Sequence, residues 1–227
     1  MTPRIAGNQA LTAKGRATRE RILDAAAGLM FAQGVAGTSL DDVKASAGVS
    51  SSQLYHYFVD KQALVMAVIS HQTDAVLAGQ QPHLAALDNM AALRAWRDVL
   101  VRFRRARGCR GGCPIGSLVS ELTETDAVAR ARLGTSFRRW EGSIRAGLRA
   151  MSERGDLAAT ADPDALALAL LAAIQGGILL TQVYRETKPM EAALDTMLAH
   201  IQSLVRPTRR TTARRGRTAR AARRKRS

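Results

Sequence analysis

Residues Thr38 to Lys61 read TSLDDVKASAGVSSSQLYHYFVDK and contain the most informative pattern of the chain. Ser39 precedes Asp42 by three residues, which is the spacing of a capping box at a helix start. Gly48 follows after a short helical repeat, and glycine readily adopts the left-handed conformation that ends a helix. A second capping-box spacing, at positions 50 and 53, marks another helix start. The stretch therefore predicts two short helices joined by a glycine-containing turn, the helix-turn-helix pattern.

The second of these helices has an apolar face and a polar face. Leu54 and Phe58 are four residues apart and are predicted to point inward. The outward positions hold hydroxyl, amide, imidazole and phenol groups in place of the Glu and Lys that a merely solvated face favours. Such groups hydrogen-bond to bases and phosphates, and the second helix of this motif enters the major groove. We therefore predict a DNA-reading helix; an ordinary helical corner is the alternative.

The predicted DNA contacts come from the two helix starts, the outward face and the start of the following helix. Gln53 is the favoured base reader, because a Gln amide pairs with adenine through two hydrogen bonds. That role competes with its capping role. We predict that four side chains lie near base edges, namely Ser51, Ser52, Gln53 and His56. The predicted phosphate contacts are Tyr55, Tyr57 and Lys61. The complete predicted set is Ser39, Ser50, Ser51, Ser52, Gln53, Tyr55, His56, Tyr57 and Lys61.

The same residues carry a family resemblance. The run GVSSSQLYHYFVDKQAL, and TRERILDAAAGLMFAQG upstream of it, resemble the DNA-binding domain of TetR-family transcriptional repressors over Arg16 to Val76. The resemblance implies an all-α protein of about nine helices, a homodimer, a pseudo-palindromic double-stranded DNA operator and a small-molecule effector. Ser52 stands where many members of the family have glycine in the recognition helix, so the resemblance does not transfer an operator sequence.

Charge and cysteine content narrow the class of protein. The net charge of the 227-residue chain is +15, but eleven Lys and Arg residues and no acidic residue lie in 206–227. Only two cysteines occur, which is compatible with a reducing cytoplasm. We read no signal peptide, and the apolar run 165–180 is interrupted by Gln175 and two glycines, which favours a buried helix over a membrane span. The expected location is the bacterial cytoplasm, on the nucleoid when DNA is bound.

The chain divides into four predicted segments. Residues 1–15 are predicted to form a flexible basic arm, and 16–76 the helix-turn-helix domain, with its motif at 39–58. Residues 77–206 form a predicted helical ligand-binding and dimerisation domain. The Arg-rich segment 207–227 has no apolar residue larger than Ala and is predicted to be a disordered tail that attracts polyanions.

Two long apolar helices close the ordered part of the chain. Asp162 and Pro163 begin the first, and Lys188 and Pro189 begin the second. We predict that they pair with their copies in a second subunit, as the TetR resemblance also implies. A fully intramolecular core is the alternative.

The middle of the chain suggests an effector pocket. One predicted helix, about 88–106, places Leu93, Trp96, Leu100 and Phe103 on an apolar face and its arginines mostly elsewhere, and the glycine-rich run 108–117 is predicted to be non-helical. Aromatic residues at helical spacing also fit a plain core. The residues predicted to line the pocket are Trp96, Leu100, Phe103, Cys113, Phe137, Trp140 and Ile174.

GCPIGSLVSEL resembles a block in the LmrA/YxaF and N-ethylmaleimide-responsive repressor branch, in which Cys113 matches the electrophile-sensing position. Arg107 and Arg110 nearby favour a thiolate. A buried small residue at a helix start is the alternative.

No catalytic or metal-binding constellation is evident, and no cofactor is predicted. The four histidines lie in separate segments, and the Cys109–Cys113 spacing is not that of a zinc site. We predict a sequence-specific, ligand-responsive transcriptional repressor that is not an enzyme. The alternatives are a nonspecific nucleoid protein that depends on the basic tail and a small-molecule carrier or enzyme.

Overall fold

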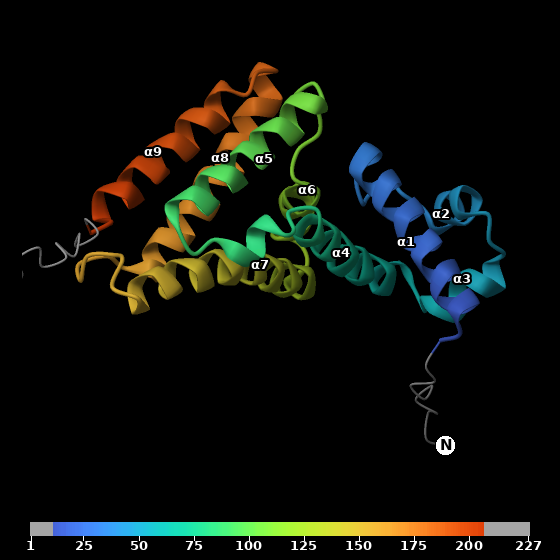
Figure 1. Cartoon of the computed structure of the whole chain (residues 1–227). Helices are drawn as coiled ribbons and strands as arrows, with labels where there is room; N and C mark the ends of the chain where they lie inside the picture. The colour runs from blue at the N-terminus through green and yellow to red at the C-terminus, as the bar shows by residue number, and fades with distance from the viewer. Residues whose placement is uncertain (1–10, 207–227) are drawn as a thin grey trace, which may run out of the picture.

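The protein is all-α, as predicted. The computed structural model describes residues 11–206, in which nine α-helices and one 3-10 helix follow one another (Figure 1). Their bounds are α1 (Ala13–Gln33), α2 (Leu40–Ala47), α3 (Ser51–Tyr57), α4 (Lys61–Ala78), η1 (His83–Ala86), α5 (Met90–Ala106), α6 (Pro114–Leu122), α7 (Ala127–Glu153), α8 (Pro163–Tyr184) and α9 (Lys188–Leu204). The predicted basic tail, 207–227, and residues 1–10 of the predicted arm lie outside the described residues.

The first helix begins earlier than predicted. Residues 12–15, which fall within the predicted flexible arm, are the N-cap and first residues of α1, because the hydroxyl of Thr12 accepts a hydrogen bond from the backbone N–H of Gly15 at 3.1 Å. The prediction of an arm over 1–15 is therefore wrong for residues 12–15. The reason is an N-cap that satisfies an orphan N–H at the start of the helix.

Helices α1, α2 and α3 group at one end of the molecule (Figure 1). Their shared core contains Ile22 and Ala26 from α1, Val43 from α2, Leu54 from α3, and Phe58 directly after α3. Gly48 between α2 and α3 has φ 61° and ψ 45°, the left-handed conformation that the sequence predicted. The two short helices are therefore held by a buried face each and by local capping.

Helix α4 connects this unit to the rest of the chain. Leu64, Val65, Val68 and Ile69 are buried, and α4 packs against α1, α6 and α7. A helix with neighbours on several sides transmits displacement between them, because packed interiors are not freely deformable. Helix α4 therefore contacts both the DNA-reading end of the molecule and the helices that follow.

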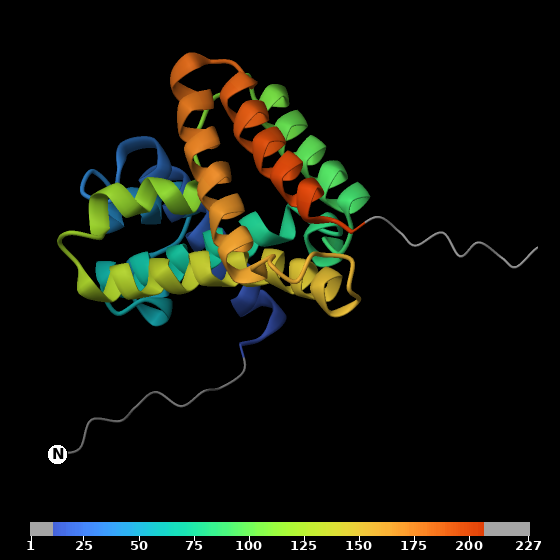
Figure 2. The same ribbon diagram turned by 90° about the vertical axis from the view of Figure 1, so that its left-hand side faces the viewer.

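The two C-terminal helices differ in how far the subunit itself covers them. Figure 2 shows α9 between α8 and α5, and the apolar residues of α9 are buried inside the subunit: Met190, Leu194, Leu198 and Ile201. Helix α8 keeps exposed apolar residues, namely Leu168, Leu179, Leu180, Val183 and Tyr184. Pairing of the two helices with their copies stays a prediction, and the buried residues of α9 are not available to it. Helix α8 alone, within residues 11–206, has the length and hydropathy of a membrane span, and it packs against α7 and α9.

The glycine-rich run contains the start of a helix. Helix α6 begins at Pro114, so residues 114–117 are helical and the prediction of a non-helical segment holds only up to Cys113. Proline fits the first helical position because its missing N–H has no partner there and its φ is already helical. The preceding loop includes three residues with positive φ, namely Gly108, Cys109 and Gly111.

Candidate DNA-reading surface and effector cavity

Helix α3 presents the polar face that the sequence predicted. Leu54 is 1% exposed and Phe58 is 3% exposed, whereas Tyr55 is 55% exposed. The other exposed residues of this segment are Ser50, Ser51, Ser52, Gln53 and His56, and Tyr57 is half-buried against the core. The His56 and Tyr57 rings meet edge-on with centroids 4.9 Å apart, which fixes both side chains at the end of the helix. Their DNA contacts remain a prediction.

Both capping boxes are formed. The carboxylate of Asp42 accepts from the backbone N–H of Ser39 at 2.9 Å, and the hydroxyl of Ser39 accepts from the N–H of Asp42 at 3.1 Å. The side-chain and backbone hydrogen bonds from Ser39 lower the pKa of Asp42. These reciprocal contacts satisfy donors that a helix start leaves unpaired.

Gln53 closes the second box. Its Oε1 accepts from the backbone N–H of Ser50 at 2.9 Å, and its own N–H donates to the Ser50 hydroxyl at 3.2 Å. Two-point pairing with adenine needs the same Oε1 as an acceptor. In the DNA-free protein the capping role occupies that atom, so the two roles that compete in the sequence meet at one oxygen.

Three cations outside the predicted set of DNA contacts lie beside this surface. Lys44 on α2 donates to Asp41 at 2.7 Å and to the hydroxyl of Ser51 at 3.1 Å, which places an ammonium beside the start of α3. The Arg19 guanidinium lies 5.5 Å from the centre of the Phe58 ring, and Arg21 donates to the carbonyl of Ala47 at 2.9 Å. The helical pattern of α1 indicates that its arginines face outward, but not which neighbour they meet.

Lys61 occupies the first position of α4. Asp60 caps this helix, with its carboxylate accepting from the N–H of Ala63 at 2.7 Å. The lysine is half-buried and adds a cation at a helix start, where phosphates are also favoured.

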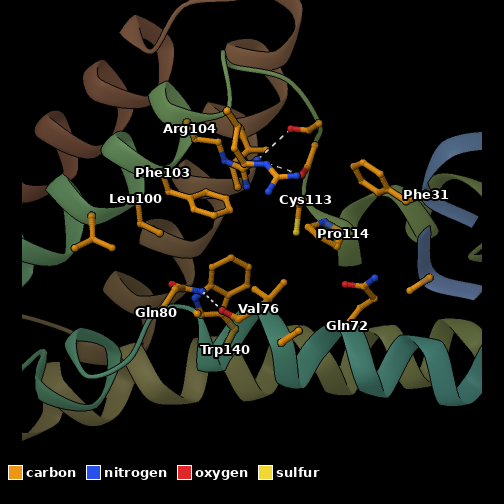
Figure 3. Close-up of a pocket in the computed structure, with 18 of the residues that line it drawn as sticks. Phe31, Gln72, Val76, Gln80, Leu100, Phe103, Arg104, Cys113, Pro114 and Trp140 are labelled. Atoms are coloured by element: carbon orange, nitrogen blue, oxygen red, sulfur yellow. Dashed lines mark hydrogen bonds between the residues drawn. The ribbon is translucent and has the colours of Figure 1, made fainter. Parts of the chain in front are cut away.

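A cavity of about 390 Å³ lies between the DNA-reading unit and the C-terminal helices (Figure 3). Its walls come from α1, α4, α5, α6, α7, α8, α9 and the loop between α5 and α6. Pockets of 300–1,000 Å³ are typical of small-molecule sites. The principal lining residues are Phe31, Gln72, Val76, Gln80, Leu100, Phe103, Arg104, Arg107, Cys113, Pro114, Trp140 and Ile178.

The predicted pocket residues divide into two groups. Leu100, Phe103, Cys113 and Trp140 line this cavity, and Phe137 lines an adjoining cavity of about 590 Å³ that also reaches Cys113. Trp96 and Ile174 line neither cavity, and both are fully buried in the core. Trp96 reaches the cavity only indirectly, by donating its indole N–H to Gln80 at 3.0 Å.

The apolar face predicted for α5 is partly wrong. Phe103 is 51% exposed, and the neighbouring Arg104 is buried in its place at 8% exposure. The guanidinium groups of Arg104 and Arg107 each lie 5.4 Å from the centre of the Phe103 ring. Burial lowers the pKa of Arg104. A hydrophobic pattern places charged residues outside, so it has no means of finding a buried arginine.

Helix α6 also touches the end of α1. The Glu121 carboxylate accepts a hydrogen bond from the backbone N–H of Val35 at 2.7 Å. Because α6 starts beside the cavity and reaches the segment after α1, it connects the cavity wall to the DNA-reading unit.

Comparison with known proteins identifies the family. Residues 22–68 match the model of the bacterial regulatory proteins of the tetR family, and residues 89–197 match that of the tetracyclin repressor-like C-terminal domain. An uncharacterised HTH-type transcriptional regulator from Lactococcus lactis is 30% identical over 190 residues, which are 80% of this chain and 92% of that protein. The chain belongs to the TetR family of transcriptional regulators.

Other TetR-family relatives cover similar shares of the chain. The transcriptional regulator AcuR from Cereibacter sphaeroides is 27% identical, covering 74% of this chain and 78% of that protein. The HTH-type transcriptional repressor DhaR from a Mycobacterium species is 23% identical, covering 78% and 88%. The helix-turn-helix of this chain is therefore that of a sequence-specific DNA-binding regulator.

Solved structures show the same fold. A TetR transcriptional regulator from Chloroflexus aurantiacus superposes with a TM-score of 0.70 at 27% identity, covering 86% of this chain and 99% of that one. Reduced NemR from E. coli superposes with a TM-score of 0.64 at 23% identity, covering 84% and 98%. The likeness to NemR shows the fold alone, so covalent sensing at Cys113 stays a hypothesis.

The described residues also bear on metals and disulfides. Between residues 11 and 206, no three His, Cys, Asp or Glu side chains are grouped to hold a metal ion. Cys109 and Cys113 are both buried and free.

Proposed function

We propose that this TetR-family regulator is a cytoplasmic repressor, which binds a pseudo-palindromic operator as a homodimer and leaves it when a small molecule fills the cavity. The name of the relative DhaR supports the repressor role. The observation that carries the proposal is the composition of the cavity wall, which includes Phe31 of α1 and Val76 of α4 together with Leu100 of α5 and Pro114 of α6.

The coupling follows from these contacts. A ligand between α1, α4 and α6 changes the packing of helices that hold the DNA-reading unit, and such coupling requires that the ligand favours one of two arrangements. A change in the angle of α4 alters the separation of the two reading helices in a dimer, and the operator fixes that separation at one helical turn or a multiple.

DNA selection tests the DNA-binding part of the proposal. The full chain is used to select binding sites from a random pool, and affinity is then measured by gel shift at fixed salt. Lys61→Ala is expected to lower the affinity for all DNA sequences by a similar factor, whereas Gln53→Ala is expected to relax the preference for particular sequences. Arg102→Gln, an exposed charge change on α5, is the matched control. Unchanged binding by both reading-surface variants would contradict the assignment.

Deleting residues 207–227 separates this proposal from a nonspecific nucleoid protein. A repressor of the proposed kind keeps its preference for a palindrome without the tail, although its overall affinity falls as phosphate contacts are lost. Loss of all sequence preference would favour the nucleoid protein.

The dimer interface is proposed at α8 and α9. Helix α8 supplies exposed Leu179 and Val183, and the outer face of α9 has small exposed residues, Ala192 and Ala199, that allow close approach. Pairing with a second copy covers this surface in a two-fold interface. Val183→Glu is expected to give a monomer in size-exclusion chromatography with light scattering, whereas Val128→Glu, at an exposed apolar residue of α7, is expected to remain dimeric.

Covalent sensing is the second form of release. Cys113 is buried and lines both cavities. Its thiolate Sγ would form a C–S bond to the β-carbon of an α,β-unsaturated carbonyl compound, and the α-carbon would take a proton from water. A Cys113→Ser variant that still releases DNA after treatment with such a compound would exclude this route.

A further inference from the structure

The effector cavity contains buried positive charge that no acidic side chain of residues 11–206 balances. Arg104 and Arg107 both contribute to its wall, and no Asp or Glu of the described residues lines this cavity or the adjoining one. Figure 3 shows Arg104 above the cavity, beside Phe103 and the segment that leads to Cys113. Removing a guanidinium from water without a counter-ion is costly.

The hydrogen bonds of Arg104 leave one edge of its guanidinium unused. Its Nη1 donates to the carbonyls of Gly111 and Gly112, at 3.0 and 3.1 Å. No partner of Nε or Nη2 lies within residues 11–206. Among residues 11–206, the side-chain nitrogens that are fully buried and lack a hydrogen-bond partner are those of Trp140 and Gln175. Nε and Nη2 of Arg104 are not among them, so these two groups are accessible from the cavity or from solvent.

Two other arginines show what this edge normally binds. In Arg97, Nε and Nη2 donate to the two carboxylate oxygens of Asp195, at 2.8 and 2.7 Å. In Arg149, the same two nitrogens donate to both oxygens of Asp164, at 3.0 and 2.7 Å. This paired geometry suits a carboxylate and is among the strong hydrogen-bonding arrangements in proteins. Arg104 has the same edge and lacks the carboxylate.

Helix α6 adds to the positive potential at the same place. Its N-cap is Cys113, which makes no side-chain capping hydrogen bond, and Cys113 and Pro114 both line the cavity. The start of a helix carries a partial positive charge and unpaired N–H groups, both of which favour an anion. The remaining wall is mainly apolar, with Val76, Leu100 and Phe103 among its members.

We propose that the effector is an amphipathic monocarboxylate, whose carboxylate pairs with Nε and Nη2 of Arg104 and whose apolar body lies against the apolar part of the wall. The proposal rests on the cavity being the effector site of the proposed function. It accounts for a buried cation that the protein itself leaves without an acidic partner.

Matched probes test the proposal without DNA. The full chain is titrated with 4-phenylbutanoate and with 4-phenylbutanamide, which has the same shape and no charge, and binding is followed by tryptophan fluorescence, since Trp140 lines the cavity. The carboxylate is expected to bind about 10- to 100-fold more tightly than the amide. Equal affinities in the unaltered protein would overturn the proposal.

Variants locate the effect. Arg104→Gln is expected to reduce the carboxylate-to-amide ratio to about one, whereas Arg102→Gln, an exposed arginine on the same helix, is expected to keep it. A ratio that survives Arg104→Gln would also overturn the proposal. If Arg104→Gln fails to fold, Arg104→Lys keeps a cation without the paired edge and is expected to lower the ratio. An unchanged ratio in this variant would exclude the paired geometry.

DNA binding is measured separately, so the two proposals fail separately. A carboxylate that binds through Arg104 and leaves operator affinity unchanged would contradict the repressor mechanism and support the anion site. If the unaltered protein binds no operator, the repressor proposal fails, whereas the fluorescence titration is performed without DNA and still tests the anion site.

Discussion

The helix-turn-helix at residues 39–58 and the cavity segment at 100–117 use polar groups in opposite ways. In the first, each helix start is closed by a reciprocal pair, and the polar groups find partners three residues away. In the second, the buried Arg104 reaches the carbonyls of Gly111 and Gly112 and leaves other donors free. The reading surface is pre-organised by its own hydrogen bonds, whereas the cavity keeps binding capacity for another molecule.

The apolar residues of the two regions also differ in how deeply they are buried. Leu54 holds α3 against a closed core, while Phe103 is half-exposed between two guanidinium groups. A DNA-reading helix needs a fixed orientation on DNA, whereas an effector site needs space for a ligand. The following experiments challenge this contrast, in order of decreasing expected effect.

Leu54→Ala tests whether the reading helix depends on its buried anchor. The change is expected to lower the free energy of unfolding by about 2–5 kcal/mol, because it removes a fully buried side chain and leaves a cavity. Urea denaturation followed by circular dichroism measures it. Phe103→Ala is the paired variant, and its cost is expected to stay below about 1 kcal/mol because the ring is half-exposed. Equal losses would remove the contrast.

Glu121→Ala tests the connection between the two regions. It leaves the backbone N–H of Val35 without its carboxylate acceptor, and the expected cost is about 1.5–3 kcal/mol, as for hydrogen bonds to charged groups. The same variant is expected to weaken the effect of the ligand on operator affinity. Glu124→Ala, an exposed acid for which no hydrogen bond is seen within residues 11–206, is the control. Full ligand response in Glu121→Ala would show that coupling does not need the contact between Glu121 and Val35.

Ser50→Ala tests the closure of the recognition helix. Loss of the cap is expected to cost about 1 kcal/mol of unfolding free energy and to free the Gln53 side chain. Ser52→Ala, one residue into the helix, is expected to change stability by less than about 0.5 kcal/mol. Thermal unfolding compares the two variants. A smaller loss for Ser50 than for Ser52 would show that the box contributes nothing.

The first capping box is expected to be sensitive to acid. The pKa of Asp42 is lowered in the folded protein, so its contribution to stability is present above the unfolded pKa and is lost as the pH falls through the folded value. The stability difference between the unaltered protein and Asp42→Asn should shrink as the pH drops below 3.8, the ordinary value for the group. Urea midpoints over a pH series provide the measurement, and a constant difference would contradict the assignment.

Much of the DNA-reading unit was predictable because its signals are local. Capping boxes, the left-handed glycine and a buried pair four residues apart all act within one or two helical turns, so the chain displays them directly. The start of α1 was missed because a single Thr cap before Ala13 is a weak signal beside the basic residues that follow.

The cavity and the C-terminal packing were only partly predictable. The sequence pattern identified apolar residues on α5, α8 and α9, but it does not say which faces meet. The apolar face of α9 is buried because α5 and α8 lie against it. The placement of Trp96 and Ile174 in the core likewise depends on packing between helices far apart in sequence.

The all-α fold and the TetR-type helix-turn-helix could be predicted from the chain alone, because they follow from local hydrogen bonding, periodicity and a run of matching residues. Three features required the folded structure: Arg104 is buried without an acidic partner among residues 11–206, Gln53 Oε1 accepts a hydrogen bond at the Ser50 cap, and α1 forms part of the cavity wall. Burial and pairing of a charge depend on every segment that surrounds it, and those segments meet only when the chain has folded.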